Sequence, residues 1–528
     1  MIYKLLKYNK LLLVLSFSFG LFNYCGFSQN SFTKSFIPYS DSNFNFHSSI
    51  KSTYYQEMVL INAPIDSNSL IKTKKNTSSD SNGIIIVLPE IDLVGGRGIA
   101  NLGYGATIKL NYKNKICFNL TGMSYNTASP EYFNDYFSNR NVYYGERKSF
   151  KTNMGMGFNR LRYNVSYAPS KYFLFDAGRG KHFLGDGYRS LLLSDNAAEY
   201  PYFKVEANLW HFKYFNLWTA MQSFDKINSK KYSKYGVFHY LSWNVSKRVN
   251  ISVFESIIWQ RSDSTGVRGF EINYLNPILF YRPVEFSLGS PDNSVMGLNY
   301  KIKIKRKQLL YGQFFIDDLI VGELKQDIKH LIHPDDKNIK YGYWTNKQAF
   351  QVGWKSFDVF KKQGLMIQNE INVVRPFTYS HRNPTQNYSN FYQSLTHPMG
   401  SNFMELVSFV RYNYKRIFVE YEMLNAKVGL DTLGSHFGNN IFLSTYDTYD
   451  PKRPNIVVKQ YYNYPAQGLK SYLFFTGIKI SYLVYPDNNL RFETGIYYRS
   501  ISNEQYKNGA YYFYFGIRTS LEKLNFDF

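Results

Sequence analysis

The chain of 528 residues lacks any long apolar run after its N-terminal region. A membrane-spanning helix needs roughly 20 consecutive apolar residues, and the mean hydropathy of -0.37 agrees that such segments are missing. Insertion into a membrane therefore requires a β-barrel.

Cysteine and acidic residues are also scarce. Only Cys25 and Cys117 occur, and because Cys25 falls within the predicted export signal, we expect no intrachain disulfide. The 62 Lys and Arg residues outnumber the 39 Asp and Glu residues, which gives a formal net charge of +23. Nucleic-acid binding would explain this excess, but so would a cell surface rich in acidic lipid headgroups and acidic polysaccharide. The predicted export signal favours the cell-surface explanation of this positive charge, so we expect no nucleic-acid partner.

The export signal is predicted at residues 1–28. Lysines precede an apolar stretch at residues 11–22, and Gly26 and Ser28 are small residues suited to cleavage before Gln29. Lipidation at Cys25 is the alternative, although residues 22–24 match the usual pattern poorly. Residues 29–82 are rich in Ser, Asn, Thr and Lys and are expected to form a weakly ordered periplasmic segment.

From Gly83 to Phe528 the hydrophobic period is two, and aromatic residues make up 19% of the chain. Met296 to Ile304 and Phe513 to Leu521 alternate apolar with polar or small residues. A soluble β-sandwich shows the same alternation, but the aromatic content also suits the girdles of a membrane barrel. Phe528 follows an aromatic strand, which resembles a barrel-assembly signal.

The lengths of the connections favour the membrane barrel. Short turns are predicted at 113–114, 168–170, 211, 246–248, 305–307, 358–363, 413–415 and 484–489. Long loops are predicted at 126–153, 180–202, 224–235, 260–293, 317–346, 375–402 and 425–470. Short periplasmic turns and long extracellular loops are typical of outer-membrane barrels. The fold class is thus all-β, a transmembrane antiparallel barrel of about 18 strands, with residues 269–275 assigned to a loop.

The stretch Gly178 to Ala197, GRGKHFLGDGYRSLLLSDNA, is interpreted as an extracellular loop folded inward as a plug. Its backbone must be satisfied by protein or water inside the barrel, and a charge network of Arg179, Lys181, Asp186, Arg189 and Asp195 would anchor it. The alternative is a polysaccharide-binding site. Its candidate residues are Tyr188, Arg189, Asp195, Asn196 and Tyr200. A hydrolase triad of His182, Asp186 and Ser190 is a weaker hypothesis, because no strained elbow presents a nucleophile.

Other loops offer weaker candidates. Asp317 and Asp318 are a carboxylate pair for acid–base chemistry or, more simply, for ion pairs between loop and wall. Metal binding is considered for His330, His333, Asp335 and Asp336, and Ca²⁺ binding for Asp431, Asp447 and Asp450.

Loop aromatics interleaved with Asn, Lys and Arg suit stacking on sugar rings and binding of uronate-like acids, or packing among themselves. They are Tyr132, Phe133, Tyr136, Phe137, Tyr143, Tyr144, Tyr446, Tyr449, Tyr461, Tyr462 and Tyr464.

Four blocks in one order carry a family resemblance. They are residues 178–197, 276–293 (NPILFYRPVEFSLGSPDN), 311–319 (YGQFFIDDL) and 373–406. Together they resemble the capsule-assembly Wzi-type barrels and the RemB-like gliding-motility barrels of Bacteroidetes. The resemblance implies an outer-membrane barrel that binds surface polysaccharide as a lectin, or one associated with gliding and the cell surface. The short polar N-terminal stretch departs from the Wzi-type pattern, which puts a helical periplasmic module in doubt.

We therefore expect a non-enzymatic protein of the cell outer membrane without cofactor or metal. Its expected partners are surface polysaccharide, outer-membrane lipids and proteins of a gliding or secretion apparatus. A porin or solute channel, a barrel subunit of a secretion or adhesin complex, and a surface hydrolase using Asp317 are the alternatives.

Overall fold

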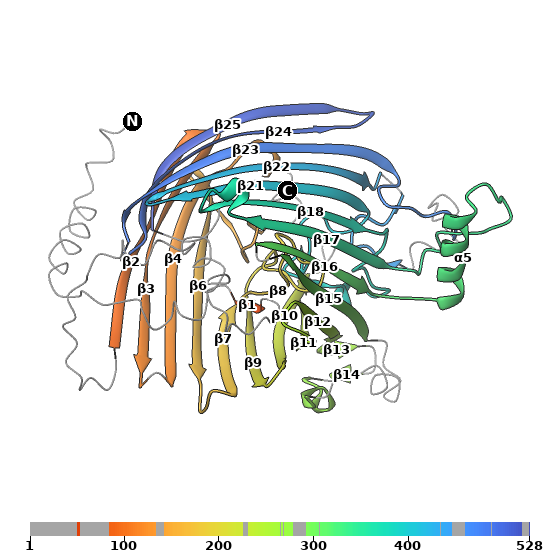
Figure 1. The fold of residues 1–528 in the computed structure, drawn as a ribbon, viewed down its shortest axis with the longest axis horizontal. Coiled ribbons are helices and arrows are strands. Elements are labelled where there is room, and N and C mark those ends of the chain that lie inside the picture. The colour runs from red at the N-terminus through yellow and green to blue at the C-terminus, as the bar shows by residue number, and fades with distance from the viewer. Residues whose placement is uncertain are drawn as a thin grey trace.

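Eighteen strands form a closed antiparallel β-barrel, as the sequence predicts (Figure 1). The computed structural model describes residues 50–52, 84–113, 115–133, 142–224, 231–263, 266–267, 269–277, 292–305, 307–432, 435–445, 460–486, 488–519 and 527. Residues 1–28, with the predicted export signal, lie outside these ranges.

Each wall strand pairs with its neighbours in the wall, and the last strand closes on the first. The wall strands are β2 (Ile84–Arg97), β3 (Ile99–Tyr112), β4 (Ile116–Ala128), β6 (Gly155–Tyr167), β7 (Phe173–Gly180), β9 (Tyr200–Leu209), β10 (Phe212–Phe224), β11 (Lys231–Asn244), β12 (Val249–Gln260), β15 (Asn293–Lys305), β16 (Gln308–Ile316), β17 (Gln348–Phe357), β18 (Leu365–Val374), β21 (Phe403–Tyr414), β22 (Ile417–Leu430), β23 (Leu469–Tyr485), β24 (Leu490–Ser502) and β25 (Lys507–Arg518). Closure pairs Asp92 of β2 with Arg518 of β25 in register.

Short elements lie outside the wall, all but β1 in the connections between wall strands. They are β1 (Ile50–Ser52), β5 (Phe150–Thr152), β8 (His182–Leu184), β13 (Ser262–Asp263), β14 (Gly266–Val267), β19 (Ser389–Asn390), β20 (Gln393–Ser394), the 3-10 helices η3 (Ile272–Leu275), η4 (Val359–Lys361) and η5 (Pro384–Gln386), and α5 (Val321–Ile332). The assignment of residues 269–275 to a loop is confirmed, since η3 forms there.

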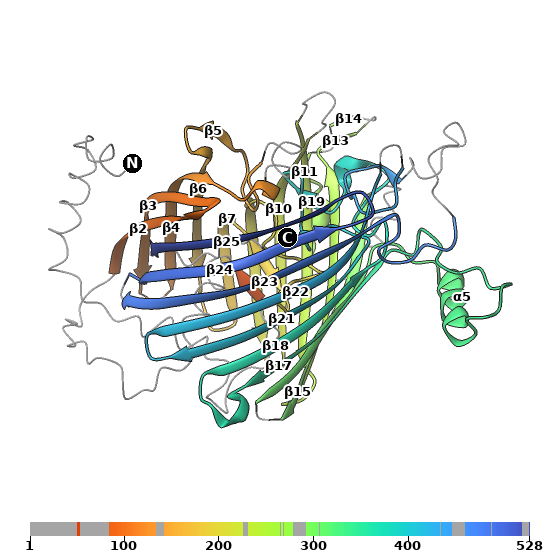
Figure 2. The ribbon, with the colours of Figure 1, turned by 90° about the horizontal axis from the view of Figure 1, so that it is seen from above.

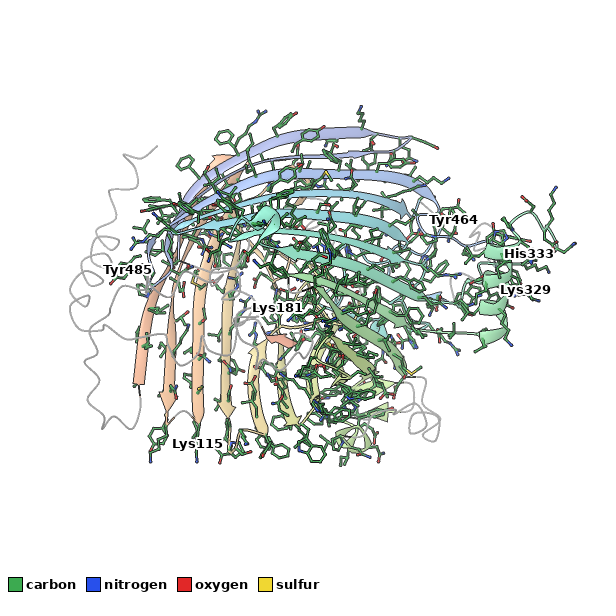
Figure 3. All side chains as sticks on the ribbon, in the orientation of Figure 1. Lys115, Lys181, Lys329, His333, Tyr464 and Tyr485 are labelled. Atoms are coloured by element: carbon green, nitrogen blue, oxygen red, sulfur yellow. The ribbon has the colours of Figure 1, made fainter. Side chains whose placement is uncertain are left out.

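The predicted alternation of short and long connections is present. Lys115 and Tyr485 mark two short turns in Figure 3, and Tyr464 and Lys329 mark the opposite end, with Lys181 between them. Two loops are shorter than predicted, because β10 extends to Phe224 before β11 begins at Lys231, and β22 extends to Leu430.

The long-loop end also has two tight connections, Gly98 between β2 and β3 and residues 503–506 between β24 and β25.

The wall is inside-out relative to a soluble protein. On β6, Leu161 and Val165 are exposed on the outer face, whereas Arg160, Arg162 and Asn164 are buried on the inner face. An apolar outer face with a polar interior is what outer-membrane barrels present to lipid and lumen. The protein is accordingly an outer-membrane β-barrel.

One loop contains a helix that the sequence analysis missed. α5 lies between β16 and β17 and projects beyond the ends of the strands in both ribbon views (Figure 2). Val321, Leu324, Ile328 and Leu331 recur at helical spacing, which explains its formation. Within the described residues, no helix is long and apolar enough to span a bilayer.

β1 and Asp527 both contact the inward-folded loop. The backbone of β1 pairs antiparallel with β8 of the inward-folded loop, although it belongs to the segment predicted to be periplasmic. Asp527 is buried against Arg189 of the same loop. The last strand ends at Arg518, well before Phe528, which lies outside the described residues.

Candidate functional site

Two loops fill the lumen as a plug, residues 181–199 between β7 and β9 and residues 375–402 between β18 and β21. Leu191, Leu192 and Leu193 are completely buried in one apolar cluster with Tyr379 and Tyr388 of the second loop. The predicted inward folding of the first loop is confirmed. The second was predicted only as a long loop, and its role in the plug was missed.

Wall side chains hold the backbone of the first loop. The Glu370 carboxylate on β18 accepts hydrogen bonds from the backbone N–H groups of Tyr188 (2.7 Å) and Arg189 (3.0 Å). It also accepts one from the Tyr311 hydroxyl at 2.8 Å. A Cβ at Gly187 would lie 2.6 Å from this carboxylate, so the close approach requires glycine.

The Gln313 amide on β16 makes a second anchor. Its oxygen accepts from the Leu191 N–H at 2.7 Å, and its nitrogen donates to the Leu184 carbonyl at 2.9 Å. Lys301 on β15 pairs with Asp186 at 3.3 Å. The plug thus has neutral and ionic bonds to the wall, which satisfy backbone groups that water would otherwise bind.

The two loops are also bonded to each other. The hydroxyls of Tyr379 and Tyr388 donate to the carbonyls of Leu191 (3.1 Å) and Leu192 (2.7 Å). The Asn390 amide donates to the Ala198 carbonyl at 2.8 Å. The plug is therefore one body built from both loops.

Most residues of the predicted polysaccharide site are buried in this body. The Tyr188 hydroxyl and the Arg189 guanidinium both donate to the Asp527 carboxylate, at 2.6 and 2.8 Å. Burial and this carboxylate raise the pKa of Tyr188 well above its usual range.

The other residues of that prediction have separate partners. The Asn196 amide donates to the Ser394 carbonyl at 2.8 Å, and Tyr200 lies against His182. Asp195 is partly exposed. The structure brings Tyr188 and Arg189 together at Asp527 and gives Asn196 and Tyr200 different neighbours.

Several residues of the predicted charge network are paired with residues that are distant in the sequence. Arg179 lies 3.5 Å from Glu199, which also pairs with Arg162 of β6 at 2.7 Å. Lys181 is buried, and burial lowers the pKa of its ammonium group. Gly145 has a φ of +73°, and a Cβ there would lie 3.0 Å from the Lys181 ammonium nitrogen, so this position also favours glycine.

The residues considered as a hydrolase triad point to other partners. The Ser190 hydroxyl donates to the Leu184 carbonyl at 2.6 Å, and the His182 Nδ1 lies 3.3 Å from the Tyr200 hydroxyl. Burial and the nearby Lys204 ammonium lower the pKa of His182 to about 3, so its ring is neutral.

Asp317 and Asp318 occupy structural positions. The buried Asp317 carboxylate accepts the Tyr379 N–H at 2.8 Å, and Asp318 pairs with Lys347 at 2.9 Å. These contacts are the ion pairs and loop anchors that were weighed against acid–base chemistry.

The candidate metal ligands are similarly placed. His330 belongs to α5 and stacks on Tyr341 with ring centroids 3.6 Å apart. The Asp431 carboxylate accepts from the backbone N–H groups of Phe437 and Asn440. Within the described parts of the chain, no group of three or more His, Cys, Asp or Glu residues is arranged to hold a metal. Asp447 and Asp450 lie outside those parts, as do Tyr136, Phe137, Tyr446 and Tyr449.

A cavity with about 90 Å³ of room for solvent lies at the long-loop end, beside the plug. It is enclosed by the ends of β2, β3, β4 and β6 and by the loop after β4. The lining residues are Asp92, Ile99, Asn101, Tyr125, Thr127, Ala128, Ser129, Phe133, Tyr143, Tyr144, Gly145, Glu146, Phe158, Arg160, Lys181 and Arg518.

Aromatic rings line one side of this cavity. Phe158 of β6 stacks between Tyr125 and Tyr143, with ring centroids at 4.7 and 4.5 Å. Tyr143, Phe133 and Tyr144 are among the loop aromatics singled out from the sequence. Such flat, partly polar surfaces provide apolar contact together with hydroxyl groups.

A chain of charges lines another side. Arg160 donates to Glu146 at 2.9 Å and to the Tyr125 hydroxyl at 3.0 Å. Tyr125 in turn donates to Asp92 at 3.2 Å, and Arg518 donates to Asp92 at 3.1 Å. These bonds fix the directions of the Arg160, Tyr125 and Asp92 side chains in the cavity wall.

Among the residues that the structure describes, two buried acceptors in the lining have no hydrogen-bond partner. They are the Asn101 side-chain oxygen and the Glu146 Oε2. Buried polar atoms without partners cost free energy unless water or a ligand supplies them. Sequence reasoning missed Asn101, Glu146 and Arg160. The sequence pattern that could have indicated this site is the pair of arginines at positions 160 and 162, which point inward on a strand with an apolar outer face.

No family model and no curated protein matches the chain. Solved barrels are similar in fold. The Escherichia coli outer-membrane protein Wzi, described as a carbohydrate-binding β-barrel involved in group 1 capsule assembly, is 12% identical over 83% of this chain and 84% of that chain, with a TM-score of 0.49. Pseudomonas aeruginosa OprD is 9% identical over 83% and 94%, with a TM-score of 0.41. Acinetobacter baumannii OccAB2 is 8% identical over 83% and 97%, with a TM-score of 0.42. At such values the likeness concerns the general barrel architecture alone.

Proposed function

We propose that this protein is a non-enzymatic outer-membrane barrel that binds polysaccharide at the cell surface and does not serve as an open channel. The observation that carries the proposal is the cavity beside the plug. It combines stacked rings of Tyr125, Phe158 and Tyr143 with the unpartnered acceptors of Asn101 and Glu146. A sugar presents an apolar ring face to such rings and hydroxyl donors to such acceptors.

The packing of the lumen supports the same proposal. Two loops with completely buried side chains occupy the interior, and wall residues such as Glu370 and Gln313 bond to the first of them. A porin needs a continuous water-filled path through the lumen. A role in gliding-type motility or adhesion, and membership of a RemB-like group in Bacteroidetes, stay predictions from the resemblance.

Binding of the detergent-purified barrel to the cell's own extracted surface polysaccharide tests the proposal. Asn101→Leu keeps the size of the side chain but removes the acceptor, and Phe158→Ala removes the central ring of the stack. We expect saturable binding by the wild type and at least tenfold weaker binding by both variants.

The matched control is Tyr172→Ala, which removes an exposed aromatic residue in the short turn between β6 and β7, outside the cavity lining. Heat-modifiable gel mobility verifies that each barrel is folded. No saturable binding by a folded wild type overturns the proposal.

A further inference from the structure

Four cations from three parts of the chain surround the segment that leaves the cavity. Arg147 and Lys148 follow Glu146 and lead into β5, and the Lys148 and Lys231 ammonium groups are direct neighbours. The Arg147 guanidinium lies within electrostatic range of Lys231, the first residue of β11, and of Arg179 on β7. Residues distant in sequence thus concentrate positive charge at one point of the long-loop end.

Nearby carboxylates do not neutralise this charge. Glu199 lies near Arg147 but is engaged by Arg162 and Arg179. Across the described ranges, Arg147, Lys148 and Lys231 form no ion pair. Neighbouring like charges repel one another, so an anion bound here would gain electrostatic energy from all of them.

The segment also has polar atoms without partners. The Nε of Arg147 and the hydroxyls of Ser149 and Thr152 are buried and make no hydrogen bond to the described part of the chain. Burial and the neighbouring Arg179 lower the pKa of Arg147. With Glu146 Oε2, four unpartnered groups fall within residues 146–152.

Arg147 of this cluster faces the plug. The Arg147 guanidinium packs over the ring of Phe391 at 4.5 Å, and Phe391 belongs to the second plug loop. Its neighbour Glu146 lines the cavity. A ligand in the cavity is therefore next to Arg147, and a lipid headgroup would approach from the outer face of the wall.

We propose that Arg147, Lys148 and Lys231 bind the carboxylate of an acidic sugar residue, in the same polysaccharide whose ring and hydroxyl groups enter the cavity. This inference rests on the proposed function and adds the substrate class, an acidic polysaccharide with uronate-type groups. A planar guanidinium with two ammonium groups is suited to a carboxylate, because it supplies directed donors and charge together.

The test compares two forms of one ligand. The cell's extracted polysaccharide is used as isolated and after chemical reduction of its carboxyl groups to alcohols. The protein variants are wild type, the double variant Lys148→Gln with Lys231→Gln, and Arg147→Met. A charge-matched control, Lys325→Gln with Lys329→Gln, removes two lysines from α5 (Figure 3).

We expect the wild type to bind the acidic form more tightly than the reduced form, with an affinity that falls as salt rises. The double variant should bind the acidic form about three- to tenfold more weakly and the reduced form equally well. Arg147→Met should weaken binding of the acidic form further, and the α5 control should bind both forms as the wild type does.

The outcomes separate the two proposals. Binding to neither form by a folded wild type overturns the proposed function itself. Equal binding of both forms, unchanged in the double variant, leaves the proposed function standing and overturns the acidic site. Variants that alter binding to lipopolysaccharide micelles but not to the polysaccharide would assign the cluster to a lipid headgroup and overturn the inference.

Discussion

The plug and the mouth segment, residues 142–152, lie side by side but treat buried polar groups differently. In the plug, wall side chains such as Glu370 and Gln313 take up backbone groups, and leucine side chains fill the space. A few plug atoms are also unpartnered, including His182 Nε2. Of the first plug loop, however, only Lys181 borders the cavity, whereas the mouth segment contributes Tyr143 to Glu146.

This contrast indicates how a loop with a structural role can be told from a ligand-binding cavity inside a polar lumen. A buried loop is held in place when side chains fill the space around it and its polar groups are hydrogen-bonded. A buried cavity whose lining contains acceptors without partners leaves both room and hydrogen-bonding capacity for a ligand. Loop aromatics and charges alone do not distinguish the two, because both regions contain them.

Removing the plug should have the largest effect. Replacing residues 185–196 with a short Gly-Ser linker deletes the leucine cluster and its anchors, so we expect a stable single-channel conductance where the wild type shows none. Planar-bilayer recording measures this. A wild type that already conducts steadily would contradict the filled lumen, and a folded variant that stays closed would show that the second plug loop closes the lumen without the first.

Loss of one wall anchor should come next. Glu370→Ala leaves the N–H groups of Tyr188 and Arg189 and the Tyr311 hydroxyl without their acceptor. We expect the free energy of unfolding to fall by about 3 to 5 kcal/mol, measured by urea titration of the folded barrel. Glu504→Ala, at an exposed position between β24 and β25, is the control and should change it by less than about 0.5 kcal/mol. Equal effects of the two substitutions on the free energy of unfolding would show that Glu370 does not anchor the plug.

The fold was largely predictable, because it depends on local patterns. The period of two, the short turns and the Gly-rich stretch with three leucines all lie in continuous sequence. The second plug loop was not recognised, because residues 375–402 are rich in Ser, Asn and Thr and look solvent-exposed. A polar lumen, however, uses these residues as buried partners for the other loop, as Asn390 does for Ala198.

The cavity was predictable only in part. Phe133, Tyr143 and Tyr144 were recognised as loop aromatics with the potential to bind sugars. Asp92 and Arg518 meet only because the last strand closes on the first, and sequence spacing carries no sign of that contact. Asn101 and Glu146 are ordinary residues whose importance comes from what they lack in the folded chain.

Acid should weaken the plug. Burial and nearby lysines lower the pKa of His182 to about 3 and that of His381, in the second plug loop, to about 4. The unfolded chain takes up protons near pH 6.5, so it binds more protons than the folded chain between pH 6.5 and these values. Stability is therefore complete above pH 6.5 and falls as the pH is lowered.

Urea titrations at pH 7.5 and 5.5 measure this effect. His182→Gln should reduce the loss of stability between the two pH values, because it removes one group that gains a proton on unfolding. An unchanged difference in the variant would show that His182 does not contribute, and a gain of stability in acid would contradict the assigned direction.

The smallest effects should come from a matched pair of serines, one in each region. The Ser190 hydroxyl donates to the Leu184 carbonyl and accepts from the N–H groups of Leu192 and Leu193, so Ser190→Ala should cost about 1 to 3 kcal/mol of unfolding free energy. The Ser149 hydroxyl in the mouth is buried without a partner, so Ser149→Ala should change stability by less than about 0.5 kcal/mol or increase it. The same urea titration measures both. If Ser149→Ala destabilises as much as Ser190→Ala, the Ser149 hydroxyl has a bound water as its partner, and the contrast between these two hydroxyls does not hold.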